Sequence, residues 1–227
     1  MKKYSLVFLD ADDTLFDYTR AEKYALVETL AQYGIPAEQK LFERYSEINN
    51  QYWRMFERGE ISQTKLRSER FSLLFTEAGI NCAGQQFSED YLRSLSEASF
   101  LLEDAISICA YLNEKYITAI ITNGIRHVQF NRLERSGLMP HIRHVIVSEE
   151  AGTNKPDPDI FLYAEKQTGI KNRNEMIIIG DSLSSDIQGG FNYGIDTCWF
   201  NAKRTQNTTG LVPAYEIHSL AEIKTIL

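Results

Sequence analysis

Cysteine is scarce in this chain, with three residues among 227, and no two of them form a C-x-x-C pair. This argues against a disulfide framework and against a cysteine-ligated zinc site, so we expect free thiols in a reducing cytoplasm. Long hydrophobic runs are absent as well, and no stretch approaches the ~20 apolar residues that a membrane-spanning helix requires. The first apolar run ends already at Asp10, too early for a secretory signal. We therefore expect a cytoplasmic protein with no membrane partner.

Positive charge is also in short supply. The chain has 24 Lys and Arg against 31 Asp and Glu, which gives a formal net charge of -7. Nucleic acids and anionic membranes bind basic surfaces, so neither is an expected partner. A small anionic ligand stays compatible with this charge if cations gather in a cleft. The histidines lack the spacing of metal ligands, and we expect surface or packing roles for His127, His141, His144 and His218.

What the sequence does contain is a series of short, bounded apolar runs that alternate with helical patterns. The runs have the length of strands, and the central ones are rich in Ile and Val, as is typical of parallel strands buried on both faces. Two helical patterns end at Gly137 and Gly169, where a helix C-terminus favours glycine. This alternation predicts a doubly wound, Rossmann-like α/β sheet. The predicted strands are residues 4–9, 117–121, 145–147, 176–179 and 197–200.

One region, from Thr19 to Glu97, interrupts the alternation with helical periodicity alone. Its apolar stripes are Leu41, Tyr45, Ile48 and Tyr52, and Phe71, Leu74, Phe75 and Ala78. We predict an inserted α-helical cap domain at 18–95 and a discontinuous core domain at 1–17 and 96–227. Trp53 and Phe56 are expected to pack inside the helices. Near the C-terminus, Ser219 and Glu222 have the spacing of a capping box before a last helix.

Polar residues follow the predicted strands directly, where ligands bind in open parallel sheets. The ends of four strands deliver Asp10, Asp12 and Asp13; Thr122, Asn123 and Gly124; Lys155; and Asp181 and Asp186. Singly, each of these residues also fits an ordinary turn. Together they bring acidic groups, a hydroxyl, backbone amides and one lysine to one edge. Crowded carboxylates repel one another, and a bound cation would offset that repulsion.

The ordered set resembles the four motifs of the haloacid dehalogenase (HAD) superfamily of phosphohydrolases. The matching stretches are D-A-D-D-T-L, T-N-G, K-P and G-D-S-L-S-S-D, and the resemblance covers essentially the whole chain, including the helical insertion. The phrases ITNG, RLERSGL, VIVSEEAGTNKP and CWFNA look like the house-cleaning pyrimidine 5'-nucleotidases of that superfamily. The resemblance implies a phosphatase of small phosphate monoesters, nucleoside monophosphates above all. Asp13 departs from the glycine usual in many of these phosphatases, and a role in shaping the loop is at least as plausible for it as a catalytic one.

The resemblance also implies a role for each matching residue. Asp10 is expected to be the nucleophile that forms an aspartyl-phosphate, and Asp12 the general acid and base, its pKa raised by a neighbouring carboxylate. Mg²⁺ is the implied cofactor, held by Asp10, Asp181 and the backbone carbonyl of Asp12, with Asp186 orienting the site from outside the ligand shell. Thr122, the amides around Asn123 and Gly124, and Lys155 are expected to hold the phosphoryl oxygens. As contacts for a nucleoside we name Phe16, Tyr18, Trp53 and Arg126.

Several alternatives stay open at this point. A phosphatase of sugar phosphates or other phosphometabolites shares every motif, and a phosphomutase would differ only in protecting its phospho-aspartate from water. A 2-haloacid dehalogenase needs no acid for a leaving alkoxide, so Asp12 counts against it. A signalling receiver domain carries no helical insertion, and a phosphate-binding module without activity is the remaining possibility.

Overall fold

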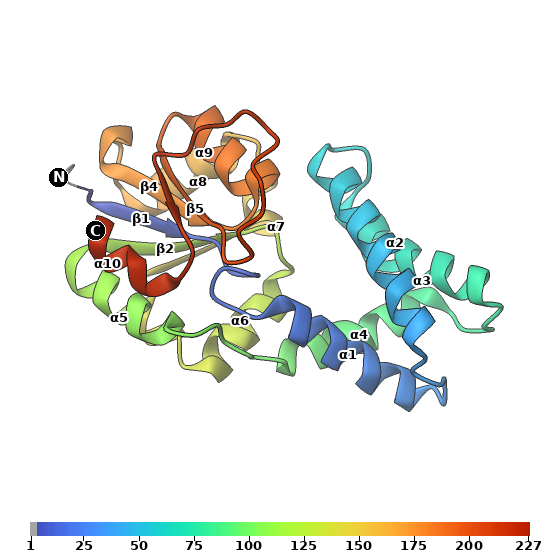
Figure 1. Ribbon diagram of the computed structural model, residues 1–227. Helices are drawn as coiled ribbons and strands as arrows, with labels where there is room; N and C mark the ends of the chain where they lie inside the picture. Colours follow the sequence, from blue (N-terminus) through green and yellow to red (C-terminus); the bar gives the residue numbers. More distant parts are fainter. Residues whose placement is uncertain (1–3) are drawn as a thin grey trace. The chain divides into compact units, whose positions relative to one another are not determined.

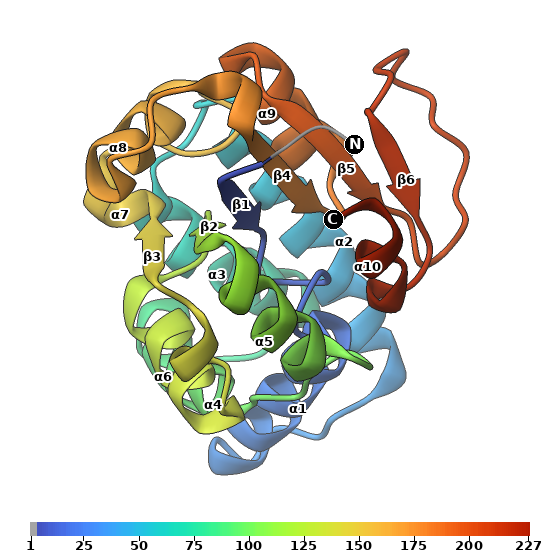
Figure 2. The same cartoon turned by 90° about the vertical axis from the view of Figure 1, so that its left-hand side faces the viewer.

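The computed structural model describes residues 4–227, which form two compact units. One unit comprises the described part of Met1–Tyr18 together with Ser99–Leu227, and the other comprises Thr19–Ala98. We call them the α/β unit and the helical unit. Figures 1 and 2 together label their strands and helices. No helix of the described chain is both long and apolar enough to cross a membrane.

The α/β unit is built on a parallel six-stranded sheet in the order β3-β2-β1-β4-β5-β6 (Figure 2). Its first strand lies at the centre, where Leu9 pairs with Ile120 of β2 and with Ile179 of β4. The carboxyl ends of these three strands therefore meet. The strands are β1 (Leu6–Leu9), β2 (Ile117–Thr122), β3 (His144–Val147), β4 (Met176–Gly180), β5 (Asp196–Phe200) and β6 (Tyr215–Ile217).

Alternate residues of the strands face two separate hydrophobic cores, one on each side of the sheet. Val7 and Leu9 of β1 belong to one core, and Leu6 and Phe8 belong to the other. Helices cover both sides, so the predicted doubly wound fold is confirmed. The helices of this unit are α5 (Ala105–Lys115), α6 (Arg126–Ser136), α7 (Ser148–Ala151), α8 (Asp159–Thr168), α9 (Gln188–Tyr193) and α10 (Ile223–Ile226).

Helix ends agree with the sequence prediction, and strand ends agree less closely. Gly137 and Gly169 end α6 and α8 with φ of 80° and 75°, a left-handed conformation that glycine adopts without steric cost. The capping box of Ser219 and Glu222 is present before the last helical turns. β1 begins at Leu6 rather than at residue 4, and the short edge strand β6 was not predicted. Three residues carry too little alternation to mark a strand.

The helical unit contains α1 from Thr19 onward and three further helices, without a strand. Its core is aromatic: the rings of Tyr45, Phe71, Phe87 and Tyr91 lie with centroids 5.0–6.0 Å apart. The predicted stripes point inward, except that Ala78 is exposed near the end of its helix. The packing role is confirmed for the buried Phe56, and the half-buried Trp53 ring meets it edge to face. The helices are α1 (Tyr18–Gln32), α2 (Gln39–Glu57), α3 (Gln63–Ala78) and α4 (Gly84–Glu97).

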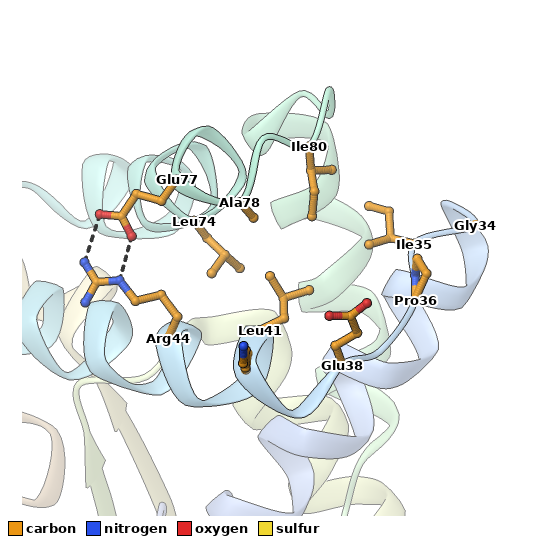
Figure 3. A pocket seen from close by; sticks show the side chains of 11 residues that line it. Gly34, Ile35, Pro36, Glu38, Leu41, Arg44, Leu74, Glu77, Ala78 and Ile80 are labelled. Atoms are coloured by element: carbon orange, nitrogen blue, oxygen red, sulfur yellow. Dashed lines mark hydrogen bonds and ion pairs between the residues drawn. The ribbon is translucent and has the colours of Figure 1, made fainter.

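A cavity of about 690 Å³ lies within the helical unit (Figure 3). Leu41, Leu74 and Ile80 supply apolar lining, and a two-pronged ion pair from Arg44 to Glu77 borders it, with N–O distances of 2.6 and 2.8 Å. None of the motif residues named above lines this cavity. The cavity alone therefore carries no catalytic chemistry.

The three cysteines are free, as predicted. Two of them, Cys109 and Cys198, are fully buried, and burial raises the pKa of each thiol to about 12. A thiol that stays protonated is a poor nucleophile and a poor metal ligand. Both residues therefore act as small apolar side chains of the core.

Candidate active site

The centre of the candidate site is a buried lysine between two carboxylates. The Lys155 ammonium donates hydrogen bonds of 2.6 Å to Asp10 Oδ1 and to Asp186 Oδ1, and one of 2.7 Å to the carbonyl oxygen of Ile121. The side chains of Lys155 and Asp186 are 2% and 1% exposed. Three acceptors thus take the three ammonium protons. The structure brings the first, third and fourth motifs into direct contact.

Burial and like charge together make Asp10 an unusual carboxyl group. Burial, then the charge of Asp186, raise the pKa of Asp10 from 3.8 to about 7, although Lys155 opposes that rise. Burial alone would lower the pKa of Lys155, but the charges of Asp10 and Asp186 outweigh it and raise that pKa. The lysine is therefore a permanent cation, while Asp10 changes charge near neutral pH.

Asp181 completes an acidic cluster that has the composition of a divalent cation site. Carboxylate oxygens of Asp10, Asp181 and Asp186 lie within 4.8 Å of one another. Three carboxylates face one ammonium, so two negative charges in the cluster lack a cation. Burial and the charges of Asp10 and Asp186 raise the pKa of Asp181 well above its ordinary value. Oxygen donors with this excess charge fit a hard divalent metal ion.

Within the cluster, Asp186 differs from the other two carboxylates. Its Oδ1 accepts from Lys155, and its Oδ2 accepts from the Ser182 backbone N–H at 3.0 Å. Both oxygens thus have protein donors, as the predicted orienting role requires. Gly180 makes this possible, because a Cβ at that position would lie 2.3 Å from the Asp186 carboxyl group.

Asn123 fixes the loop that carries Lys155. Its Nδ2 donates to the Lys155 carbonyl oxygen at 2.9 Å, and its Oδ1 accepts from the Lys155 N–H at 2.8 Å. The neighbouring hydroxyl of Thr122 accepts from the Gly124 N–H at 3.0 Å. The side chain of Asn123 therefore positions the lysine, while the amides predicted to hold phosphate belong to the backbone around it. The third-strand loop begins helix α8 at Asp159, directly after Pro158.

Asp12 lies in a different environment from the one expected. We predicted a second carboxylate beside it, and the structure adds two donors to that neighbour: its oxygens accept from Arg132 Nη1 at 2.5 Å and from Gln129 Nε2 at 2.6 Å. Both donors come from α6. Neither was predicted, because polar residues on a helix ordinarily face solvent and no motif in the sequence marks these two.

Asp13 shapes the loop after β1 and is not one of the three carboxylates of the acidic cluster. Its φ is 58°, a left-handed conformation that aspartate and asparagine tolerate better than most residues other than glycine. Its Oδ1 accepts from the Tyr18 N–H at 3.2 Å, at the start of α1. This explains why aspartate can replace the glycine usual at this position, and it favours the loop-shaping role.

The four residues predicted to contact a nucleoside have different surroundings. Phe16 is fully buried, and the Arg132 guanidinium lies 4.2 Å above its ring, so the predicted ligand contact is wrong for Phe16. The Arg126 side chain pairs with Glu150 at 2.5 Å. Tyr18 begins α1, and Trp53 is half-buried in the helical unit. Thr14 was missed by sequence reasoning: its hydroxyl accepts from the Asp181 N–H at 3.1 Å.

Comparison with known proteins identifies the family. A family model described as haloacid dehalogenase-like hydrolase matches residues 4–194. The chain belongs to the haloacid dehalogenase-like hydrolases. It is 36% identical to the HAD-hydrolase YfnB of Bacillus subtilis over 100% of this chain and 97% of that protein. A crystal structure of YfnB, described as bound to magnesium and as revealing interdomain movement, has a TM-score of 0.94 over 100% of this chain and 99% of its own.

Two further relatives of this HAD hydrolase carry names that state an activity. The pyrimidine 5'-nucleotidase PynA of Streptococcus pneumoniae is 34% identical over 97% of this chain and 93% of its own length. The pyrimidine 5'-nucleotidase YjjG of Escherichia coli is 31% identical over 99% of this chain and 98% of its own. The resemblance that the motifs indicated is confirmed.

Proposed function

We propose that this HAD hydrolase is a Mg²⁺-dependent phosphatase that cleaves phosphate monoesters through an aspartyl-phosphate on Asp10, with pyrimidine nucleoside 5'-monophosphates as its preferred substrates. The observation that carries the proposal is the cluster in which Lys155 pairs with Asp10 beside Asp181 and Asp186. The substrate class is supported by the two nucleotidase relatives, which match nearly the full chain. The cytoplasm is the compartment we propose for it.

In the first step, an oxygen of Asp10 attacks phosphorus, and the bond from phosphorus to the ester oxygen breaks. The leaving oxygen takes the proton of the Asp12 carboxyl group. In the second step, a water molecule gives a proton to the Asp12 carboxylate and attacks the same phosphorus, which breaks the bond to Asp10. One hard displacement thus becomes two easier ones.

The residues that surround the phosphoryl group would supply charge and hydrogen bonds. Magnesium, held by Asp10, Asp181 and the backbone carbonyl of Asp12, neutralises phosphoryl charge when it is bound. The Thr122 hydroxyl and the N–H groups around Asn123 and Gly124 would donate to phosphoryl oxygens. Lys155 reaches a phosphoryl oxygen if it exchanges one of its three protein acceptors for it.

We further propose that the helical insertion, residues 18–95 by its predicted limits, acts as a cap that excludes water and selects the leaving group. Two observations support this: YfnB is described as showing interdomain movement, and the insertion contributes none of the groups assigned above to phosphoryl transfer.

The experiment is release of inorganic phosphate from a panel of nucleoside monophosphates and sugar phosphates, with magnesium and with EDTA. Asp10→Asn removes the nucleophile, and Asp159→Asn is the matched control, since Asp159 is exposed at the start of α8. We expect magnesium-dependent release that is strongest for pyrimidine monophosphates, lost in Asp10→Asn and retained in Asp159→Asn. Release from sugar phosphates alone would refute the proposed substrate class. No release from any member of the panel would refute the proposed phosphatase reaction.

A further inference from the structure

Two residues of α6 donate hydrogen bonds to the carboxyl group of Asp12. Gln129 and Arg132 are three positions apart, which places them on the same face of the helix. Gln129 Nε2 donates to one oxygen of Asp12 at 2.6 Å, and Arg132 Nη1 donates to the other at 2.5 Å. With both oxygens held, the plane of the Asp12 carboxyl group is fixed.

Exposure shows which side of this pair faces outward. The Arg132 side chain is 0% exposed, whereas the Asp12 side chain is 27% exposed. Asp12 can therefore meet a ligand, and Arg132 cannot. The guanidinium is held in turn, because it lies 4.2 Å above the ring of the fully buried Phe16.

The glycine of the T-N-G motif leaves the space that Gln129 occupies. A Cβ at Gly124 would lie 2.1 Å from Gln129 Nε2, and real atoms do not approach so closely. The same Nε2 lies 3.4 Å from the Thr122 hydroxyl. Gln129 thus connects Asp12 with the hydroxyl assigned above to phosphoryl binding.

A buried arginine paired with a carboxylate is a costly way to stabilise a fold. Taking the Arg132 charge fully out of water, and the Asp12 charge partly, offsets much of their attraction. Well-packed apolar side chains often serve stability as well or better. The pair therefore makes more sense as a device that sets the orientation of one particular carboxyl group.

We propose that Gln129 and Arg132 are positioning residues for Asp12, which aim its carboxyl group at the oxygen of the leaving group; the inference rests on the proposed phosphatase function. It adds to that function by assigning these two residues of α6 to a single step, the transfer of a proton to the leaving group. Proton delivery matters for an alkoxide such as the 5'-oxygen of a nucleoside. It matters little for p-nitrophenyl phosphate, whose phenolate leaves without a proton.

The test compares kcat/KM for a nucleoside monophosphate and for p-nitrophenyl phosphate, because kcat/KM reports the steps up to departure of the leaving group. In Gln129→Met, which keeps the side-chain length and removes the donor, we expect kcat/KM for the nucleotide to fall at least about tenfold further than for p-nitrophenyl phosphate, part of the 10²–10⁴ that a general acid supplies. Gln167→Met, at an exposed position of α8 in the α/β unit, is the matched control and should leave both values unchanged.

Arg132→Lys should show the same split, and Arg135→Lys, exposed in the same helix, is its control. Because Arg132 is buried, folding is checked by circular dichroism, and Gln129→Met decides the matter if Arg132→Lys does not fold. Equal losses on both substrates in folded Gln129→Met would overturn the proposal, as would no loss on the nucleotide. A wild-type enzyme inactive on both substrates would instead refute the phosphatase function and the positioning role with it.

Discussion

Replacing Lys155 by methionine would leave two nearly buried carboxylates without their cation. The Asp10 and Asp186 side chains are 10% and 1% exposed, and each accepts a 2.6 Å hydrogen bond from the ammonium. Removal of one partner from a buried ion pair destabilises a protein by about 3–5 kcal/mol. We expect a loss of this size in the free energy of unfolding at pH 8 without metal.

The loss should shrink as the pH falls. The pKa of Asp10 is raised from 3.8 to about 7 even with Lys155 present, and removal of the cation raises it further. Between pH 3.8 and about pH 7, Asp10 holds a proton in the folded protein that it has released in the unfolded chain. The Asp10 carboxyl group therefore favours folding more at pH 5 than at pH 8. At pH 5 Asp10 is neutral in the variant and is no longer a stranded charge.

Urea unfolding at pH 5 and pH 8, in EDTA, measures both effects. Lys166→Met, exposed in α8, is the matched control and should stay within about 0.5 kcal/mol of the parent. The double variant with Asp186→Asn should recover part of the loss, since it removes one stranded charge. A Lys155→Met protein within about 1 kcal/mol of the parent at pH 8 would refute the assigned ion-pair energetics.

Two further predictions concern the metal and the loop. Because protons compete with a cation for Asp10 and Asp181, whose pKa values are raised, Mg²⁺ should increase the melting temperature more at pH 8 than at pH 5.5 in a thermal shift assay; an equal shift at both would place the metal elsewhere. At the left-handed position 13, Asp13→Gly should leave the free energy of unfolding within about 1 kcal/mol of the parent, whereas Asp13→Val should lower it by about 1–3 kcal/mol in the same urea measurement. Equal effects of the two substitutions would show that backbone strain does not govern this position.

The sequence was most informative about the edge of the sheet. Apolar runs end where strands end, and in a parallel sheet those ends share one edge, so the convergence of Asp10, Lys155 and Asp181 could be predicted without coordinates. The positions of strand ends could not predict that Gln129 and Arg132 contact Asp12, because both residues lie on a helix. A helix shows its inward face in the sequence by apolar residues, and a polar residue that faces inward is placed by tertiary contacts that periodicity does not record.

Phe16 illustrates the opposite error. An aromatic residue just beyond a catalytic motif invites a ligand-binding role, but the structure buries its ring beneath a guanidinium. The sequence does not distinguish a ring that receives substrate from one that supports a neighbouring charge. Burial decides between them, and burial depends on segments as distant as α6.

The acidic cluster, Lys155, Thr122, Asp12 and the two α6 residues all lie in the α/β unit, although the chain leaves that unit after Tyr18 and returns at Ser99. The 80 residues between these points can accumulate substitutions without touching a reacting group. If the insertion selects the leaving group, as proposed above, chemistry and substrate choice are encoded in separate stretches of one gene. Such an arrangement lets a lineage exchange one substrate for another while its phosphoryl-transfer apparatus stays constant, and it makes the insertion the natural target for laboratory diversification.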